Sequence, residues 1–293
     1  MITAPIAAPI YSPNLQPQPT APTYKQTKML TLATWNVNSI RTRLDHLGTW
    51  LETHPVDVLC LQETKVTDEQ FPQAPWEALG YHCYISGQKA YNGVALLSRS
   101  PLTEVSRGFS PVLGSDGVGD LDDQKRVITA KLGDLRILNL YVPNGSSVDS
   151  DKYSYKLRWL ATLRDYLATL LATETQIHIC GDFNIAPGDR DIHDPQGKGN
   201  HVMATEPERQ ALQQILDLGF TDTFRQFTAE GGHFSWWDYR AGSFPRNKGW
   251  RIDHHYLSPP LADRARSCTI DAEPRYWEKP SDHAPVLLTL DQP

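Results

Sequence analysis

Residues 281–290, Ser-Asp-His-Ala-Pro-Val-Leu-Leu-Thr-Leu, place an acid–imidazole pair directly before an apolar run near the C-terminus. The apolar run predicts a buried strand. Lys279 precedes Pro280, and a residue before proline is biased toward an extended conformation. We therefore expect Asp282 and His283 to be held at the rim of a sheet, where a loop enters a core strand.

The composition is typical of a globular protein, with 293 residues of which 40% are hydrophobic and 21% charged. Every apolar run is shorter than the roughly 18 residues of a membrane-spanning helix, so we expect no membrane association. The N-terminus has no basic region before an apolar core, so we expect no secretory signal. The formal net charge of -6 argues against a non-specific nucleic-acid coat. Carboxylates gathered in one metal site would nevertheless account for much of that charge.

The cysteines give no sign of a disulfide framework or a zinc site. They are four in number and none pairs as C-x-x-C: Cys60, Cys83, Cys180 and Cys268. Cys60 and Cys180 lie inside apolar, strand-like runs, which predicts buried reduced thiols. Reduced thiols are typical of a cytoplasmic protein.

The first 28 residues differ from the rest of the chain. Prolines recur there among Ala, Thr and Gln, and this composition cannot bury enough apolar area to offset the entropy of ordering. We expect residues 1–28 to form a disordered tail, either a linker or an artefact of a start site placed upstream of Met29. No linker interrupts the remainder, so residues 29–293 are expected to form a single domain.

Hydrophobic periodicity predicts an α/β fold with many strands and few helices. Predicted helices cover residues 40–51 and 153–170, and another begins at Thr205, where Glu208 completes a capping box. Residues 110–124 are rich in Gly and Asp and predict a loop. The predicted strands are 30–37, 56–61, 81–85, 93–97, 126–131, 136–142, 176–180, 234–240, 250–257 and 286–290.

Polar side chains stand at the ends of these apolar runs. Asn36 follows the first strand and Glu63 follows the second. Residues 181–184 read Gly-Asp-Phe-Asn, so in an extended chain Asp182 and Asn184 would face one cleft while the phenylalanine packs inward. Hard oxygen donors of this kind suit Mg2+ or Mn2+ better than zinc.

Two further groups of polar residues have a less direct interpretation. Asp253 lies in a predicted strand and could fix the tautomer of a histidine, with His283 as its partner. Asp189, Asp191 and His193 resemble a second metal cluster, but a solvated loop is the better interpretation of these three residues.

Six short motifs together carry a resemblance to a known family. They are WNVN at 35–38, LQETK at 61–65, YVPNG at 141–145, GDFN at 181–184, WRID at 250–253 and SDHAP at 281–285. In this order they resemble the exodeoxyribonuclease III family of abasic-site (AP) endonucleases, within the endonuclease/exonuclease/phosphatase superfamily. The YVPNG motif and the aromatic segment 234–240 are typical of the DNA-repair branch.

The resemblance implies a four-layer α/β/β/α sandwich of two packed mixed sheets flanked by helices. It implies Mg2+-dependent hydrolysis of the phosphodiester 5' to an abasic site in duplex DNA, leaving a 3'-hydroxyl, with Mn2+ able to substitute. It also implies 3'-5' exonuclease and 3'-phosphatase activity at duplex ends, in base excision repair. A monomer acting on double-stranded DNA is expected.

The resemblance also implies a role for each motif residue. The metal would be held by Glu63, with Asn36 and Asp282 nearby, and the further metal-ligand candidates are Asp182, Asn184 and His283. Asp182 would orient or deprotonate the attacking water, and Asn184 would hydrogen-bond the scissile phosphate. Tyr141 would position that phosphate or protonate the leaving oxygen. His283, held by Asp253, would stabilise the developing charge or act as the base, so aspartate and histidine both remain candidates for that proton transfer.

A pocket for the flipped, baseless sugar would be lined by Trp236, Trp250 and Ile252, rejecting normal nucleotides by size. Arg126 and Arg240 are candidate phosphate contacts. The alternative is another metal-dependent phosphoesterase of the superfamily, acting on undamaged DNA or on a phospholipid or inositol phosphate. A DNA-binding module without chemistry is a third possibility, and the complete carboxylate, asparagine and histidine set argues against it.

Overall fold

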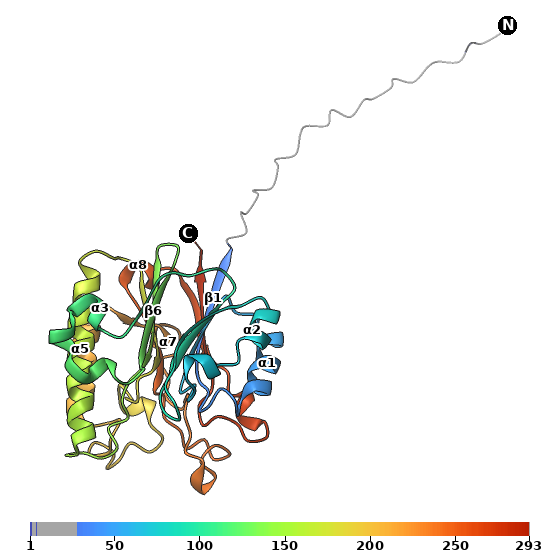
Figure 1. The fold of residues 1–293 in the computed structure, drawn as a ribbon. Coiled ribbons are helices and arrows are strands. Elements are labelled where there is room, and N and C mark those ends of the chain that lie inside the picture. Colours follow the sequence, from blue (N-terminus) through green and yellow to red (C-terminus); the bar gives the residue numbers. More distant parts are fainter. Residues whose placement is uncertain (2–3, 5–27, 293) are drawn as a thin grey trace.

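The computed structural model describes residues 28–292 together with Met1 and Ala4. The predicted tail, residues 1–28, therefore lies almost wholly outside the described residues. Two six-stranded sheets pack face to face, with helices on both outer faces (Figure 1), which confirms the predicted four-layer sandwich. None of the helices between residues 28 and 292 is both long and apolar enough to span a bilayer.

The two sheets have similar layouts. The first contains, in spatial order, β11 (Ala265–Ile270), β12 (Val286–Asp291), β1 (Met29–Asn36), β2 (Val58–Gln62), β4 (Val94–Ser98) and β3 (His82–Ser86). The second contains β5 (Thr103–Arg107), β6 (Val127–Leu132), β7 (Leu135–Tyr141), β8 (Ile177–Asp182), β10 (Asp253–Leu257) and β9 (Thr221–Asp222).

The helices form the outer layers. α1 (Leu44–Thr53) and α2 (Ala74–Ala78) pack on the first sheet, while α5 (Asp151–Leu171) and α6 (Glu206–Leu216) pack on the second (Figure 1). The short helices are α3 (Ser110–Leu113), α4 (Ser115–Val118), α7 (Thr223–Phe227) and α8 (Pro259–Ala262). Single 3-10 turns occur at η1 (Asp68–Gln70), η2 (Gly119–Asp122), η3 (Asp189–Asp191), η4 (Arg240–Gly242) and η5 (Glu273–Tyr276).

One parallel strand pair in each sheet determines where functional residues collect. β1 pairs in parallel with β2 through α1, and β7 pairs in parallel with β8 through α5, while the other strand pairs are antiparallel. The carboxyl ends of parallel strands meet at one edge of a sheet, and ligands of open α/β sheets bind there. Because the sheets face each other, the two edges lie together at one end of the sandwich.

The face between the sheets changes from apolar to polar toward this end. Side chains alternate along a strand, so Leu30, Leu32, Thr34 and Asn36 of β1 lie on the same side. Leu30 and Leu32 belong to the buried core between the sheets, whereas Thr34 and Asn36 are polar and fully buried. Gln62 of β2 joins the sheets beneath the site, because its Nε2 donates to Asn139 Oδ1 of β7 at 2.6 Å.

Two predicted helices are confirmed in detail. The apolar face of α5 is buried against the second sheet, and Ser150 caps the helix by accepting a hydrogen bond from the backbone of Tyr153. Thr205 and Glu208 form the predicted capping box at the start of α6. The helix predicted at residues 40–51 begins later, at Leu44, because the preceding residues form a turn bonded to the loop after β2.

Other local predictions are wrong. Residues 110–124 form α3, α4 and η2 in place of the predicted loop. Residues 234–240 do not form a strand; Trp236 makes only isolated bridges to Trp250 and His283, because the chain crosses from one sheet's edge to the other. Lys279 adopts a left-handed φ of 51° in place of an extended one. Tertiary bonds override its preference, since Arg43 and Tyr239 both donate to the next carbonyl, that of Pro280.

Candidate active site

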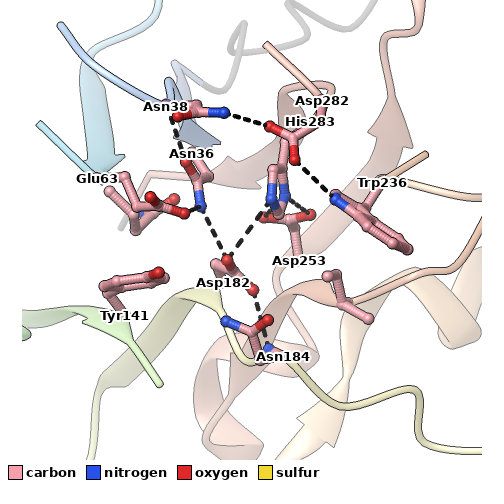
Figure 2. Close-up of polar contacts among 12 residues, drawn as sticks. Asn36, Asn38, Glu63, Tyr141, Asp182, Asn184, Trp236, Asp253, Asp282 and His283 are labelled. Atoms are coloured by element: carbon pink, nitrogen blue, oxygen red, sulfur yellow. Dashed lines mark hydrogen bonds and ion pairs between the residues drawn. The ribbon is translucent and has the colours of Figure 1, made fainter. Parts of the chain in front are cut away.

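Residues from both sheets converge at the carboxyl ends of the parallel strands (Figure 2). Asn36 ends β1, Glu63 follows β2, Tyr141 ends β7 and Asp182 ends β8. The antiparallel strand β10 contributes Asp253, which pairs in register with Asp182. The structure thus brings the sequence-predicted carboxylates, amides and phenol into one cluster.

Asp182 is the centre of this cluster and is 1% exposed. Its Oδ2 accepts a hydrogen bond of 2.9 Å from Asn36 Nδ2, and its Oδ1 accepts one of 2.9 Å from the backbone N–H of Asn184. Burial raises the pKa of Asp182 to about 7, helped by the charges of Asp253 and Glu63 and opposed by His283. A carboxylate with this pKa can exchange a proton near neutral pH.

His283 is bound on one side and open to Asp182 on the other. Its Nδ1 lies 3.1 and 2.9 Å from the two carboxylate oxygens of Asp253, while its Nε2 lies 3.7 Å from Asp182 Oδ2. Ser235 Oγ supports the acid by donating to Asp253 Oδ2 at 2.7 Å. Burial acts to lower the pKa of His283, but the carboxylates of Asp253 and Asp182 outweigh it and raise the value to about 10. The imidazole is therefore a cation at neutral pH.

Glu63 and Asn36 form the opposite wall of the site. Asn36 Nδ2 donates to Glu63 Oε1 at 2.8 Å as well as to Asp182, so one amide joins the two carboxylates. Glu63 has a left-handed φ of 50° and a side chain that is 18% exposed, so it faces the opening of the site. Lys65 Nζ lies 2.8 Å from Glu63 Oε2, which shows that this carboxylate already attracts a cation.

Asn184 reaches the site by a different route from the one predicted. Its φ of 50° is left-handed, so residues 182–184 are not extended. The side chain is nevertheless held toward the cleft: its Oδ1 accepts from Asn144 Nδ2 at 2.9 Å, and its Nδ2 donates to Val142 O at 3.0 Å. A turn, supported by the backbone hydrogen bond to Asp182, places both side chains on one side.

Tyr141 lies beside Glu63 and Asp182 in the close-up view (Figure 2). Burial and the negative charge of these two carboxylates raise the pKa of Tyr141 well above its usual value, so the phenol keeps its proton. The guanidinium of Arg126 stacks over the Tyr141 ring, 4.6 Å from its centroid, and donates to the Tyr141 carbonyl at 3.2 Å. Arg126 therefore braces the tyrosine at the margin of the cleft.

Asp282 lies apart from the central carboxylates. Its Oδ1 accepts from Asn38 Nδ2 at 2.9 Å, and its Oδ2 accepts from Trp236 Nε1 at 3.0 Å. Burial opposes ionisation, but His283 and these two donors together lower the pKa of Asp282. It therefore links the β1 loop to the aromatic segment.

The three predicted pocket residues pack together. Trp250 is 7% exposed and Ile252 is 1% exposed, both in an apolar cluster that also includes Tyr153 and Val202, with Trp236 partly buried at its edge. Arg240 is remote from this packing, because its side chain is 92% exposed and lies only near Asp238.

The loop after β8 corrects the prediction for residues 189–193. Asp191 is 1% exposed rather than solvated, and its Oδ1 forms ion pairs with Arg225 and with Arg251 Nε, the latter at 2.7 Å. Arg251 also pairs with Asp222 at 2.6 Å, so the four charges form a buried network. Asp189 is exposed and pairs with an arginine of α6, while His193 is only partly buried.

Sequence reasoning missed several supporting residues. Asn38, Asn144 and Ser235 each bond a predicted site residue, and all three stand inside the segments quoted for the family. All three residues lie in motifs that were identified, but the pattern of a polar residue at the end of an apolar run indicates only one residue in each motif. Lys156 is fully buried, so this lysine cannot contact a DNA phosphate.

The donor atoms fit a divalent metal ion. Oxygens of Glu63 and Asp182 and a nitrogen of His283 lie within 4.8 Å of one another, and Glu63 is open to solvent on one side. A histidine held as a cation has no lone pair for a metal, which leaves the hard carboxylate oxygens as the favoured donors. Oxygen donors suit Mg2+ or Mn2+ rather than a soft metal.

Comparison with known proteins places this geometry in a family. The model of the endonuclease/exonuclease/phosphatase family matches residues 33–283. An exodeoxyribonuclease III of Haemophilus influenzae is 38% identical, over 86% of this chain and 96% of the relative. Two solved structures each cover 90% of this chain and all of their own: a Neisseria 3' phosphatase bound to a product DNA hairpin (40% identity, TM-score 0.85) and an AP endonuclease of Archaeoglobus fulgidus (41%, 0.84).

Proposed function

The chain belongs to the endonuclease/exonuclease/phosphatase family, and from this premise we propose that it incises duplex DNA at abasic sites. It is a DNA-repair nuclease of the exodeoxyribonuclease III and AP endonuclease type. The proposed reaction is hydrolysis of the phosphodiester 5' to the abasic residue. The same site would remove nucleotides and phosphates from 3' ends. The observation that carries the proposal is the convergence of Glu63, Asp182, Asn184 and His283 at one cleft.

The chemistry follows from the charges at the cleft. Water attacks phosphorus, the bond to the 3' oxygen breaks, and that oxygen takes up a proton to leave a 3'-hydroxyl. Asp182 is the proposed general base, since its pKa of about 7 lets it accept the proton of the water. His283, with a pKa of about 10, already carries its proton and instead stabilises negative charge on the phosphate.

Three other side chains complete the proposed mechanism. Asn184 donates a hydrogen bond to the scissile phosphate, and Tyr141, which keeps its proton, donates to the phosphate or to the leaving oxygen. Asp253 fixes the orientation of His283 through Nδ1, so that Nε2 faces the reaction centre.

Mg2+ is the proposed metal, held by Glu63, with Asn36 and Asp282 nearby. When bound, the ion neutralises charge on the phosphate and on the oxygen that leaves. Glu63 would exchange its ion pair with Lys65 for the metal. Mn2+, which prefers the same oxygen donors, is expected to substitute.

Substrate selection is proposed to rest on the apolar cluster at Trp236, Trp250 and Ile252. A sugar without a base could pack against Trp236 where a full nucleotide would not fit. Exposed Arg240 and the bracing Arg126 are proposed to contact backbone phosphates. One chain supplies every residue of the site, which supports action as a monomer, and the four free cysteines support a cytoplasmic setting.

An end-labelled duplex with a single abasic site tests the proposal. With Mg2+ the wild type should cut once, 5' to the site; EDTA or Asp182→Asn should abolish cutting. A matched duplex without the lesion, a duplex ending in a 3'-phosphate, and a phosphorylated inositol headgroup are the competing substrates. Faster turnover of any of these than of the abasic duplex would favour the alternative phosphoesterase and refute the proposed specificity. Cutting that survives EDTA would refute the metal requirement.

A further inference from the structure

A buried ion pair lies directly behind the cleft, between α5 and α6. Lys156 and Glu208 are both fully buried, and Lys156 Nζ lies 2.5 Å from Glu208 Oε1. Removing both charges from water costs several kcal/mol per ion. Two apolar side chains of similar volume would pack α5 against α6 at least as well. Helix packing alone therefore does not explain why a lysine and a glutamate stand at these positions.

The other two N–H groups of the Lys156 ammonium donate hydrogen bonds to backbone carbonyls of the site. Lys156 Nζ donates to the backbone carbonyl of Asn184 at 2.7 Å and to that of Asn144 at 3.2 Å. An ammonium has three donors, so Glu208 and these two carbonyls saturate it. Asn144 and Asn184 are also the two residues whose side chains bond each other at the floor of the cleft, at 2.9 Å.

The conformation of Asn184 needs this support. Its φ of 50° is left-handed, a region that residues other than glycine occupy at some cost. Its own N–H bonds Asp182 Oδ1, so the position of its backbone also sets the orientation of the proposed base. A charged donor on the Asn184 carbonyl is about twice as strong as a neutral one and fixes this peptide in place.

Glu208 is in turn immobilised on its other side. Its Oε2 accepts from the backbone N–H of Thr205 at 3.1 Å and from Thr205 Oγ1 at 2.7 Å, and its Oε1 accepts from Met203 N at 3.0 Å. The capping box of α6 therefore fixes the Glu208 carboxylate. Through its hydrogen bonds, the Lys156 ammonium in turn holds the backbone at Asn144 and Asn184.

We propose that Lys156 and Glu208 are positioning residues, which set the geometry of Asn184 and Asp182 for phosphodiester hydrolysis without contacting DNA. The inference rests on the proposed function, because it assumes that Asn184 and Asp182 carry the chemistry. It predicts that loss of the pair lowers kcat while leaving KM nearly unchanged.

The test replaces both charges at once, with Lys156→Met/Glu208→Gln. Methionine keeps most of the lysine stem, and glutamine keeps an acceptor oxygen for Thr205, so no charge is left buried and unpaired. The urea midpoint is expected to stay near that of wild type, whereas Lys156→Met alone should lower it strongly. In the double variant kcat should fall by about ten- to a hundredfold, since a misplacement of roughly 1 Å has effects of that size.

Lys131→Met is the matched control, since Lys131 also pairs with two glutamates but at the far end of the sheet, and it should leave kcat unchanged. The specific test adds Asn184→Ala to the double variant. If the pair acts through Asn184, the double substitution should lower kcat by less in the Asn184→Ala background than it does in the wild type, because the effects of coupled residues are not additive.

Several results would overturn the inference. They are wild-type kcat in a folded double variant, a rise in KM at constant kcat, or additive losses in the Asn184→Ala background. If the wild type does not cut an abasic duplex at all, the proposed specificity fails by itself, and the same variants are then compared on the 3' ends of an undamaged duplex. The two failures are therefore distinguishable.

Discussion

Asp182→Asn should inactivate the enzyme and, in the absence of metal, make its fold more stable at pH 7 and above. Asp182 is buried with a pKa raised to about 7, against an unfolded value of 3.8. For an acid with a raised folded pKa, ionisation destabilises the fold: the effect begins as pH rises above 3.8 and is complete above 7. The ionised Asp182 that acts as the base therefore lowers the free energy of unfolding of the wild type most in the pH range where the enzyme works.

The magnitude follows from that difference in pKa. Ionising Asp182 lowers the free energy of unfolding by roughly 2 kcal/mol at pH 5 and by about 4 kcal/mol at pH 8. Asparagine carries no charge, but only one of its two terminal groups is an acceptor. Its NH2 group must therefore face one of two donors, Asn36 Nδ2 or the backbone N–H of Asn184. Losing that hydrogen bond lowers the free energy of unfolding by about 1–3 kcal/mol at every pH. The free energy of unfolding of the variant, relative to wild type, should therefore rise by about 2–3 kcal/mol from pH 5 to pH 8.

Urea denaturation of both proteins in EDTA at pH 5, 6, 7 and 8 measures this difference, with exposed Asp116→Asn as the control. Mg2+ should shrink the difference at pH 8, because the metal stabilises the ionised carboxylate. Abasic-duplex cleavage by Asp182→Asn should fall by at least about a hundredfold. A stability difference that does not change with pH would refute the reasoning, because it would mean that the buried carboxylate ionises without penalty.

Three further predictions concern other parts of the molecule. Asn184→Ala should lower single-turnover cleavage about a hundredfold, the value of one well-placed donor, and near-normal cleavage would exclude its phosphate role. Arg251→Met should lower the free energy of unfolding in urea by about 3–5 kcal/mol, because Asp191 and Asp222 lose a buried partner; a loss under about 1 kcal/mol would contradict this. Burial lowers the pKa of His255 to about 4, so the unfolded chain takes up a proton first, and stability should decline as pH falls from 6.5 to 4, by about 1.4 kcal/mol per unit. His255→Gln should make that decline shallower but not remove it, because burial also lowers the pKa values of His178 and His254.

Strand-end residues were predictable because they follow from local pattern. An apolar run predicts a strand, and a polar residue that ends the run must lie at the edge of the sheet, as Asn36, Glu63 and Asp182 do. The long helix and the capping box at Thr205 are also local, since their periodicity and hydrogen bonds span only a few residues.

Segments whose conformation depends on distant partners were not predictable. Residues 234–240 have the aromatic content of a strand, yet only single bridges form, because both neighbours lie on other elements. Lys279 is left-handed despite its proline, and Asp191 is buried despite its polar loop, since arginines from remote elements bind each of these regions.

The sequence by itself determined the four-layer fold, the family and the strand-end residues that meet at the cleft. Only the tertiary structure decided what each of these residues can do. Identical carboxylates at Asp182 and Asp282 have pKa values shifted in opposite directions. Burial and two neighbouring acids raise the pKa of Asp182, whereas at Asp282 the effect of burial is outweighed by His283 and by hydrogen bonds from Trp236 and Asn38. Lys156 likewise lies fully buried behind the site, although lysine is usually a surface residue. Charge, burial and hydrogen bonding depend on neighbours that are far away in the chain, and no local pattern contains them.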